Sequence, residues 1–301
     1  MKPRIVFMGT PEFAVASLDA LMMAGHNIVG VITAPDKPAG RGMKMNESAV
    51  KKYAVEHSLN ILQPEKLKNP EFLAQLQELK ADLQVVVAFR MLPEVVWNMP
   101  PMGTINAHAS LLPKYRGAAP VNWAIINGEK ESGVTTFKLT HEIDTGNILL
   151  QKKVKINDDD AGALHDKLKE AGAELLIKTV NGLADNSITG QPQKGDEIIH
   201  APKLNTETAM INWNLPSENI HNLVRGLSPY PGAFTLLKNK VFKIYKSVFE
   251  TGATAVAPSE YETDNKSYLR FAAIDGYIYA KEVQAEGKKK MNIEEFLRGF
   301  R

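Results

Sequence analysis

The residue types best suited to chemistry lie in the segment 104–120, TINAHASLLPKYRGAAP. Asn106 and His108 are two positions apart on a predicted strand, so their side chains face the same side of the sheet. An imidazole can accept a proton from a nucleophile, and a carboxamide N–H can stabilise the oxyanion of a tetrahedral intermediate. The pair therefore suits acyl transfer. The spacing alone leaves another interpretation open, in which Asn106 caps a turn and His108 is a core residue.

Asp144 is a third candidate, in the segment HEIDTG between two predicted strands. A carboxylate beside an imidazole can set the tautomer and the orientation of the ring. The same aspartate can instead initiate an Asx turn before Gly146, a common use of this residue type in loops. The sequence pattern leaves both interpretations open.

The elements that must hold these residues alternate between strand and helix. Apolar runs predict strands at 4–9, 28–33, 83–89, 104–108, 133–139 and 148–155. Helical spacing predicts helices at 11–24, 48–58, 70–80, 121–127 and 161–183. This alternation predicts an α/β fold with a Rossmann-like, mostly parallel sheet, in which sites lie at the carboxyl ends of the strands.

The pattern changes after residue 189. Residues 190–206 mix glycine, proline and polar residues without a period, so we expect a domain linker there. A predicted helix at 216–227 and short strand-like runs at 233–237, 241–248, 268–273 and 277–283 follow. They predict a small β-barrel. The expected domains are therefore 1–189 and 207–301.

Composition and missing motifs exclude several kinds of chemistry. The 301 residues include no cysteine, so disulfides and thiolate catalysis are excluded. The turn at 9–12, GTPE, has one glycine where a dinucleotide fingerprint needs three, and no P-loop motif is present. The acidic triplet at 158–160 favours a solvated helix start over a metal site.

Charge and hydropathy narrow the possible partners. The 36 basic and 34 acidic residues leave a formal net charge of +2, so a nucleic-acid contact must use local clusters of charge. The apolar run near the N-terminus is too short for a signal peptide, and no apolar run is long enough for a transmembrane helix. With the absence of cysteine, these features favour a cytoplasmic protein without a membrane partner.

The same segments resemble the folate-dependent formyltransferases. The resemblance rests on NAHASLLP at 106–113, RGAAP at 116–120, DTG at 144–146, GTPEFA at 9–14 and PDKPAGRG at 35–42. It extends through INW at 211–213, and so spans nearly the whole chain. It implies the formyltransferase fold with an OB-like C-terminal domain, and it implies that Asn106, His108 and Asp144 are catalytic.

The resemblance also implies a folate site. The residues expected to bind folate are Ser110, Leu111, Leu112, Pro113, Phe89, Met91 and Leu92. Many family members have Tyr-Gly where this chain has Phe89-Arg90, which can alter the shape of the pterin pocket. Many also have a glycine where this chain has Glu142, which can change the conformation of the Asp144 loop.

Within the family, the resemblance is to members that formylate initiator tRNA. It implies formyl transfer from 10-formyltetrahydrofolate to the α-amino group of methionyl initiator tRNA. This amine must be neutral to attack, and a free α-amino group has a pKa of about 7.7–8.0. His108 would accept a proton, Asp144 would orient the ring, and Asn106 would stabilise the oxyanion. Folate is then a co-substrate, and neither a metal nor a permanently bound cofactor is implied.

Two basic regions are candidates for tRNA contact. The loop at 35–44, PDKPAGRGMK, carries three cations and one acid, and Arg41 and Lys44 become candidates to contact the acceptor stem. The C-terminal half has lysines at 238, 240, 243, 246 and 288–290, which can track a phosphate backbone. Both regions can instead be ordinary solvated surfaces.

Two other functions are alternatives. The first is a formyltransferase for another amine, such as an amino sugar or glycinamide ribonucleotide; the basic loop and the appended barrel argue against it. The second is a tRNA-binding module with an inactive formyltransferase domain. The complete set of Asn106, His108 and Asp144 argues against that interpretation.

Overall fold

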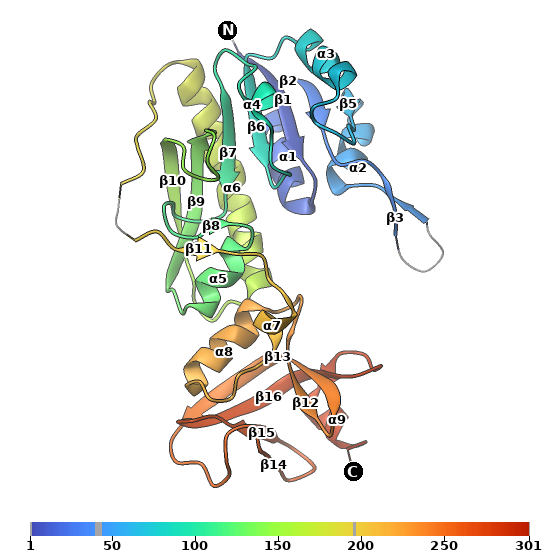
Figure 1. Ribbon diagram of the computed structural model, residues 1–301, viewed down its shortest axis with the longest axis vertical. Helices are drawn as coiled ribbons and strands as arrows, with labels where there is room; N and C mark the ends of the chain where they lie inside the picture. The colour runs from blue at the N-terminus through green and yellow to red at the C-terminus, as the bar shows by residue number, and fades with distance from the viewer. Residues whose placement is uncertain (1, 40–43, 195–196, 301) are drawn as a thin grey trace. The chain divides into compact units, whose positions relative to one another are not determined.

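The computed structural model describes residues 2–39, 44–194 and 197–300 (Figure 1). The chain divides into two compact units. The first unit contains Met1–Arg116, Gly133–Val154 and His165–His200, and the second contains Gly117–Ser132, Lys155–Leu164 and Ala201–Arg301. Arg41 lies outside the described residues, and only the backbone of Lys44 is described.

The first unit is built on a seven-stranded sheet. Its strands are β1 (Arg4–Gly9), β2 (Asn27–Ile32), β5 (Ile61–Leu62), β6 (Leu83–Val87), β7 (Thr104–His108), β9 (Glu131–Lys138) and β10 (Ile148–Lys155), in the order β10-β9-β7-β6-β1-β2-β5. β1 is parallel to β2 and β6, β2 to β5, and β6 to β7, whereas β9 is antiparallel to β7. The predicted α/β fold with a mostly parallel sheet is confirmed.

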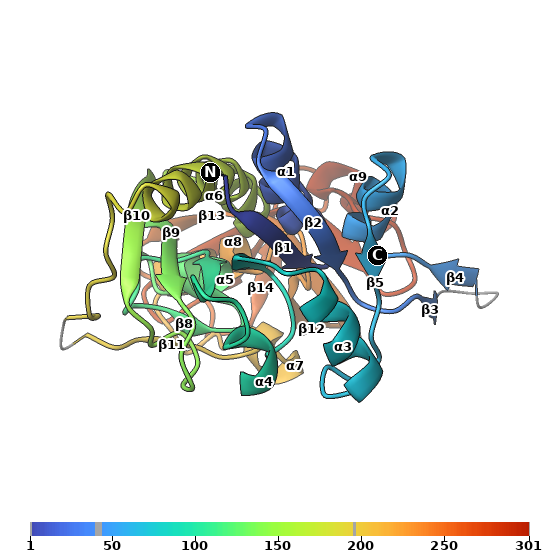
Figure 2. The same cartoon turned by 90° about the horizontal axis from the view of Figure 1, so that it is seen from above.

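Helices cover both faces of this sheet. They are α1 (Glu12–Met23), α2 (Ala49–Glu56), α3 (Pro70–Glu78), α4 (Glu94–Trp97) and α6 (Ala161–Ala184). Figure 2 shows α1 and α6 on one face and α3 and α4 on the other. Alternate strand residues pack against the two helical layers. On the α3 side, Met8 and Val86 form a buried cluster with Phe72 and Val96.

The turn after β1 explains the lone glycine of the GTPE segment. A Cβ atom on Gly9 would lie 2.6 Å from the Cβ of Ala14 and 3.0 Å from the carbonyl oxygen of Val87. The glycine is therefore needed for the close approach of α1 to the strands. This packing role does not require a phosphate ligand.

The basic loop at 35–44 has more structure than the sequence pattern predicted. Its flanks form a two-stranded hairpin, β3 (Lys37–Ala39) paired antiparallel with β4 (Lys44–Asn46). At its base, Asp36 accepts hydrogen bonds from Lys51 and, at 2.8 Å, from Gln63. Lys51 also pairs with Glu47 at 2.8 Å. These contacts hold both ends of the hairpin to neighbouring elements.

The second unit contains a curled antiparallel sheet. Its strands are β12 (Ala233–Leu237), β13 (Lys240–Thr251), β14 (Tyr261–Thr263), β15 (Leu269–Ala272), β16 (Gly276–Ala285) and β17 (Met291–Asn292). Their order is β12-β13-β16-β15-β14, with β17 also paired to β16. The register of β13 against β16 shifts near Lys246, and such irregularities bend a sheet. The result is a half-barrel, consistent with the predicted OB-like domain.

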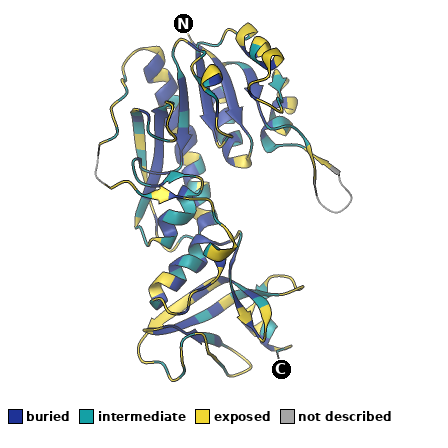
Figure 3. Cartoon of the chain, viewed as in Figure 1, coloured by how far each residue is buried: buried dark blue, intermediate teal, exposed yellow. Residues whose placement is uncertain are grey.

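Helices and aromatic rings close the interior of this half-barrel. The remaining elements are α5 (Pro120–Ile126), α7 (Thr206–Ala209), α8 (Ser217–Gly226), α9 (Ile293–Leu297), β8 (Arg116–Gly117) and β11 (His200–Ala201). Trp213 stacks on Phe271 at 4.8 Å, and its indole N–H donates to Thr235 at 3.0 Å. The α5 side chain of Asn122 donates to the Gly226 carbonyl at 2.7 Å. Figure 3 shows the buried residues along the strands of both sheets.

Candidate active site

Asn106 and His108 lie in the C-terminal half of β7, and Asp144 lies in the loop between β9 and β10. The parallel register pairs Asn106 with Val86, so Asn106 faces the same side of the sheet as that residue. His108 is two residues further along β7 and shares this face. The Asn106 side chain is half-buried and makes no hydrogen bond to the described part of the chain, which leaves its amide available to a ligand.

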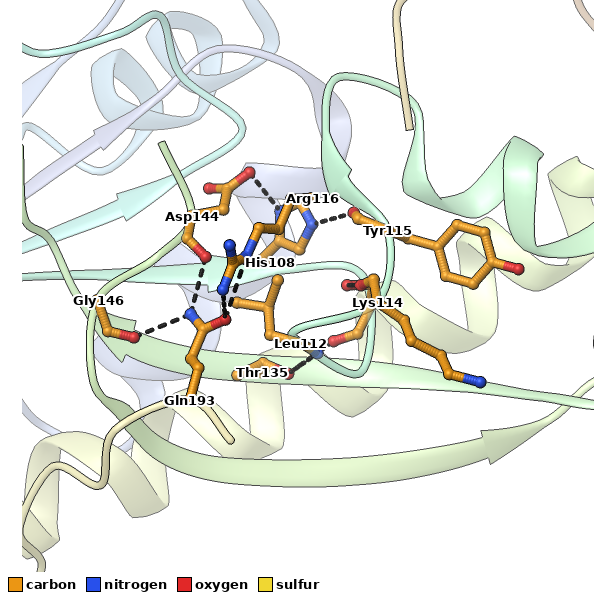
Figure 4. Close-up of polar contacts among 10 residues, drawn as sticks. His108, Leu112, Lys114, Tyr115, Arg116, Thr135, Asp144, Gly146 and Gln193 are labelled. Carbon is orange, nitrogen blue, oxygen red and sulfur yellow. Dashed lines mark hydrogen bonds and ion pairs between the residues drawn. The ribbon is translucent and has the colours of Figure 1, made fainter. Parts of the chain in front are cut away.

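Both ring nitrogens of His108 face an oxygen atom (Figure 4). Its Nε2 lies 2.8 Å from the carbonyl oxygen of Tyr115. Because a carbonyl can only accept, Nε2 carries the proton and the lone pair of a neutral ring lies on Nδ1. Nδ1 faces the Asp144 carboxylate at 3.8 Å, with the two side chains 8% and 12% exposed.

The distance between Nδ1 of His108 and the Asp144 carboxylate determines what kind of contact they make. At 3.8 Å it exceeds a hydrogen bond and is an ion-pair separation. A neutral ring presents a lone pair to the carboxylate, whereas a protonated ring presents an N–H. A proton on Nδ1 would therefore point toward an acceptor on Asp144.

Three residues around these side chains have backbone conformations that are unusual outside glycine. Ala88, Tyr115 and Asp144 have φ angles of 47°, 61° and 55°. Such conformations cost about 1–3 kcal/mol each and persist only where surrounding contacts hold them. They occur just after β6 and in the two loops that contact His108. Three of the strained backbone positions of the first unit therefore lie around His108.

The segment Ser110–Pro113 is shaped by residues from the neighbouring antiparallel strands. The Thr135 hydroxyl donates to the Ser110 carbonyl at 2.7 Å and accepts from the Leu112 N–H at 3.1 Å. Gln151 donates to the Leu112 carbonyl at 2.9 Å. Ser110 is fully buried and Leu112 is 3% exposed. A ligand at this segment would therefore meet its backbone and the more exposed side chains of Leu111 and Pro113.

A glutamine from the segment after α6 joins the two loops that contact His108. The Gln193 amide donates to the carbonyls of Asp144 at 2.7 Å and Gly146 at 2.9 Å. Its oxygen accepts from the Arg116 guanidinium at 2.6 and 3.2 Å. No sequence signal marks Gln193, Thr135 or Gln151 as part of the site, because each acts on residues far along the chain.

A cavity of about 510 Å³, largely open to solvent, lies beside the end of β6. Its lining residues are Lys66, Leu67, Lys68, Arg90, Met91, Leu92 and Pro93. It brings together Met91 and Leu92 of the predicted folate site with three cations. Ser110–Pro113 and Phe89 are not among these residues.

Arg90 lines this cavity and directly follows Phe89. Its guanidinium donates to the carbonyls of Pro64 and, at 2.8 Å, of Glu65, and it lies 5.6 Å from the centre of the Phe89 ring. Burial lowers the pKa of Arg90 from its ordinary value. Arg90 therefore forms part of the cavity wall, and its guanidinium lies near the ring of Phe89.

Within residues 2–39, 44–194 and 197–300, no three His, Asp or Glu side chains are grouped so that they could hold a metal ion. None of the helices found there combines the length and the apolar character needed to cross a membrane.

The fold and the site together define a class: an α/β protein with an amide, an imidazole and a carboxylate at strand ends, followed by an antiparallel half-barrel. The chain belongs to the formyl transferase family. The model of that family matches residues 3–180, and the model of the formyl transferase C-terminal domain matches residues 203–301.

Individual relatives are similar over nearly the whole chain. The methionyl-tRNA formyltransferase of Bacteroides fragilis is 51% identical over 307 residues, covering 99% of this chain and 95% of the relative. That of Parabacteroides distasonis is 53% identical over 310 residues, covering 99% and 96%.

A solved structure shares the fold at lower identity. The N-formyltransferase from Helicobacter canadensis in complex with folinic acid and dTDP-3-aminofucose matches with a TM-score of 0.70 and 23% identity. The match covers 95% of this chain and 100% of that chain. At this identity the likeness concerns the fold alone.

Proposed function

We propose that this protein transfers the formyl group of 10-formyltetrahydrofolate to the α-amino group of methionyl initiator tRNA. The observation that carries the reaction class is His108, held between the Tyr115 carbonyl and the Asp144 carboxylate with Asn106 on the same face. The choice of acceptor is supported by relatives named methionyl-tRNA formyltransferase at 51% and 53% identity.

The proposed mechanism assigns one task to each side chain. The neutral amine attacks the formyl carbon, and the carbonyl electrons move to the oxygen. The Asn106 amide donates to this oxyanion. His108 accepts the amine proton at Nδ1, the nitrogen left free by the Tyr115 contact, and Asp144 stabilises the imidazolium. As the carbon–N10 bond breaks, His108 returns the proton to N10 and tetrahydrofolate leaves.

The proposed co-substrate fits the chemistry of the two candidate folate regions. The flat pterin of a reduced folate needs an apolar surface and backbone polar groups, which Leu92, Leu111 and the 110–113 backbone can offer. The glutamate end of the molecule is anionic. The cavity beside β6 has three cations, and the residues lining it, all described, include no acid. No metal and no permanent cofactor enters this proposal.

The proposed tRNA contacts lie in both halves of the sequence. Arg41 and Lys44 remain our candidates in the basic loop. Among the C-terminal lysines, Lys243 donates to the Pro231 carbonyl at 2.8 Å and Lys290 pairs with Glu282 at 3.0 Å. Lys240 and Lys246 are exposed and form no ion pair with the described part of the chain, so they are the better candidates for phosphate contact.

We also propose a division of the chain into domains and a location in the cell. We assign the reaction to residues 1–189, a linker to 190–206 and tRNA binding to 207–301. The substrate is an intermediate of translation, so we place the protein in the cytoplasm, without a membrane partner.

One assay tests the proposed function. The purified protein is incubated with 10-formyltetrahydrofolate and methionyl initiator tRNA, and N-formylmethionyl-tRNA is measured. Free methionine, uncharged tRNA and a dTDP-linked amino sugar are the controls. Formylation of the amino sugar in place of methionyl-tRNA would transfer the proposal to the alternative class, and binding of tRNA without transfer would indicate an inactive catalytic unit.

A further inference from the structure

We propose that Gln193 is a positioning residue that sets the orientation of His108 by joining the two loops on either side of its ring. The inference rests on the proposed function, because it concerns the group that transfers the proton. Gln193 lies in the segment that the sequence predicts as a linker, and it is half-buried.

The four contacts of Gln193 determine which way its amide points. Nε2 faces the carbonyls of Asp144 and Gly146, which can only accept, and Oε1 faces the guanidinium of Arg116, which can only donate. The reverse orientation would place a donor against a donor and an acceptor against two acceptors. Both N–H groups and the oxygen are therefore used, and Figure 4 shows the amide between the two loops.

On one side, Gln193 supports the turn that carries Asp144. This turn has Asp144 in a left-handed conformation, with φ of 55°. Gly146 lies so close to the end of β9 that a Cβ atom would be 1.7 Å from the Lys138 carbonyl oxygen. The strand thus restricts the turn at one side, and the two hydrogen bonds from Gln193 hold its carbonyls at the other. They set where the Asp144 carboxylate lies relative to Nδ1 of His108.

On the other side, Gln193 holds the segment that contacts Nε2. Arg116 directly follows Tyr115, whose carbonyl accepts from the His108 ring at 2.8 Å. The Tyr115 backbone is itself left-handed, with φ of 61°. Anchoring the Arg116 side chain through two hydrogen bonds stabilises the backbone beside that carbonyl. One side chain therefore influences both ring nitrogens.

The segment that carries Gln193 is also held by backbone contacts that do not involve the Gln193 side chain. Two residues earlier, Gln191 exchanges two backbone hydrogen bonds with Ile148 at the start of β10, both 2.8 Å. A substitution at 193 should therefore leave the segment in place and remove only the contacts to the two loops. Gln191 is exposed, and within the described ranges its side chain forms a hydrogen bond only to Thr189, at 3.4 Å. It provides a matched control.

The expected effect is on the chemical step. A misplacement of about 1 Å at a catalytic group can cost about 100-fold in rate. For Gln193→Met, which keeps the length and removes every hydrogen bond, we expect kcat to fall about 10- to 100-fold. KM for folate and for methionyl-tRNA should change little. Gln193→Glu keeps an acceptor for Arg116 but faces the Asp144 and Gly146 carbonyls with a carboxylate, so we expect a loss at least as large.

The experiment compares Gln193→Met, Gln193→Glu and Gln191→Met with the wild type. Steady-state kinetics give kcat and KM, thermal unfolding checks the fold, and ¹⁵N NMR of labelled histidine gives the His108 tautomer. We expect the Nε2–H tautomer to dominate in the wild type and in Gln191→Met, and its share to fall in Gln193→Met.

The outcomes separate this inference from the proposed function. An inactive wild type would overturn the proposed function, while the tautomer of His108 would still test the inference. A Gln193→Met variant with kcat within about twofold of wild type and an unchanged tautomer would overturn the inference. An equal loss of kcat in Gln191→Met would also overturn the inference, because the effect would then come from disturbing the segment and not from losing the Gln193 amide.

Discussion

The two units of this protein are stabilised in different ways. Around His108 in the first unit, long-range hydrogen bonds from Thr135, Gln151 and Gln193 hold loops with unfavourable backbone conformations. In the second unit, stacked and tilted rings of Trp213, Phe271 and Phe242 fill the half-barrel. This difference fits our proposal that the first unit carries out the reaction, which needs polar groups at defined positions, and that the second unit binds tRNA on its outer face.

This difference predicts where substitutions should act. In the first unit, removing a polar side chain should reduce the rate far more than it reduces the stability. In the second unit, single polar side chains should affect tRNA affinity or stability, with little direct effect on the chemical step.

His108→Ala should lower kcat by about 10²–10⁴-fold, the usual cost of losing a general base. The substitution also leaves the Tyr115 carbonyl without its ring partner. Steady-state formyl transfer measures the loss. His141→Ala is the control, because His141 is exposed and close in sequence to the Asp144 turn. A folded His108→Ala variant within about fivefold of wild-type kcat would show that His108 is not the base.

Asn106→Ala should lower kcat by about 10²–10³-fold, since one oxyanion donor is lost. Stability should change little, because the Asn106 side chain makes no hydrogen bond within the described ranges. Kinetics and thermal unfolding of the same preparation check both statements. An increase in KM alone would instead make Asn106 a binding residue.

Arg41→Ala should weaken tRNA binding without changing folate affinity. A phosphate contact predicts a decrease of about one unit in the salt slope of tRNA binding, and a base contact predicts a loss of about 1–3 kcal/mol on the cognate tRNA. Titrations of methionyl-tRNA and folate at several salt concentrations distinguish these results. Lys246→Ala in the second unit should only decrease the salt slope of tRNA binding, as expected for a phosphate contact. Unchanged tRNA affinity in Arg41→Ala would assign the loop to an ordinary solvated surface.

His221 should make the second unit sensitive to acid. It lies on α8, its Nδ1 is 2.9 Å from the Ser247 hydroxyl, and burial together with the Arg225 charge lowers its pKa to about 4. An unfolded histidine has a pKa of about 6.5, so the unfolded chain binds the proton first as the pH falls. The stability contribution is therefore present above pH 6.5 and is lost toward pH 4.

The size of this acid effect should be modest. Because the ring is partly exposed, solvent screening reduces the expected loss to about 1–2 kcal/mol. Urea unfolding at pH 7 and pH 5 measures it, with His221→Gln as the comparison. Equal pH dependence in the two proteins would contradict the assignment to His221.

Much of the fold was predictable because its causes are local. Apolar runs predicted β1 and β6, whose residues pack on both faces, and helical spacing predicted α1 and α6 close to their observed bounds. Several short elements were missed. The two strands of the β3–β4 hairpin, α4 and β14 are each three or four residues long, too few for a period to stand out.

For the candidate site, the sequence by itself determined that Asn106 and His108 share one face, because side chains alternate along any strand. Only the tertiary structure decided how the imidazole is used. It placed the Tyr115 carbonyl at Nε2, which leaves Nδ1 as the basic nitrogen, and it placed Asp144 3.8 Å from Nδ1. It also brought Gln193 to both loops, from 49 residues beyond Asp144 and 77 beyond Arg116. Such contacts depend on strand order and loop closure, which no local pattern of residues encodes.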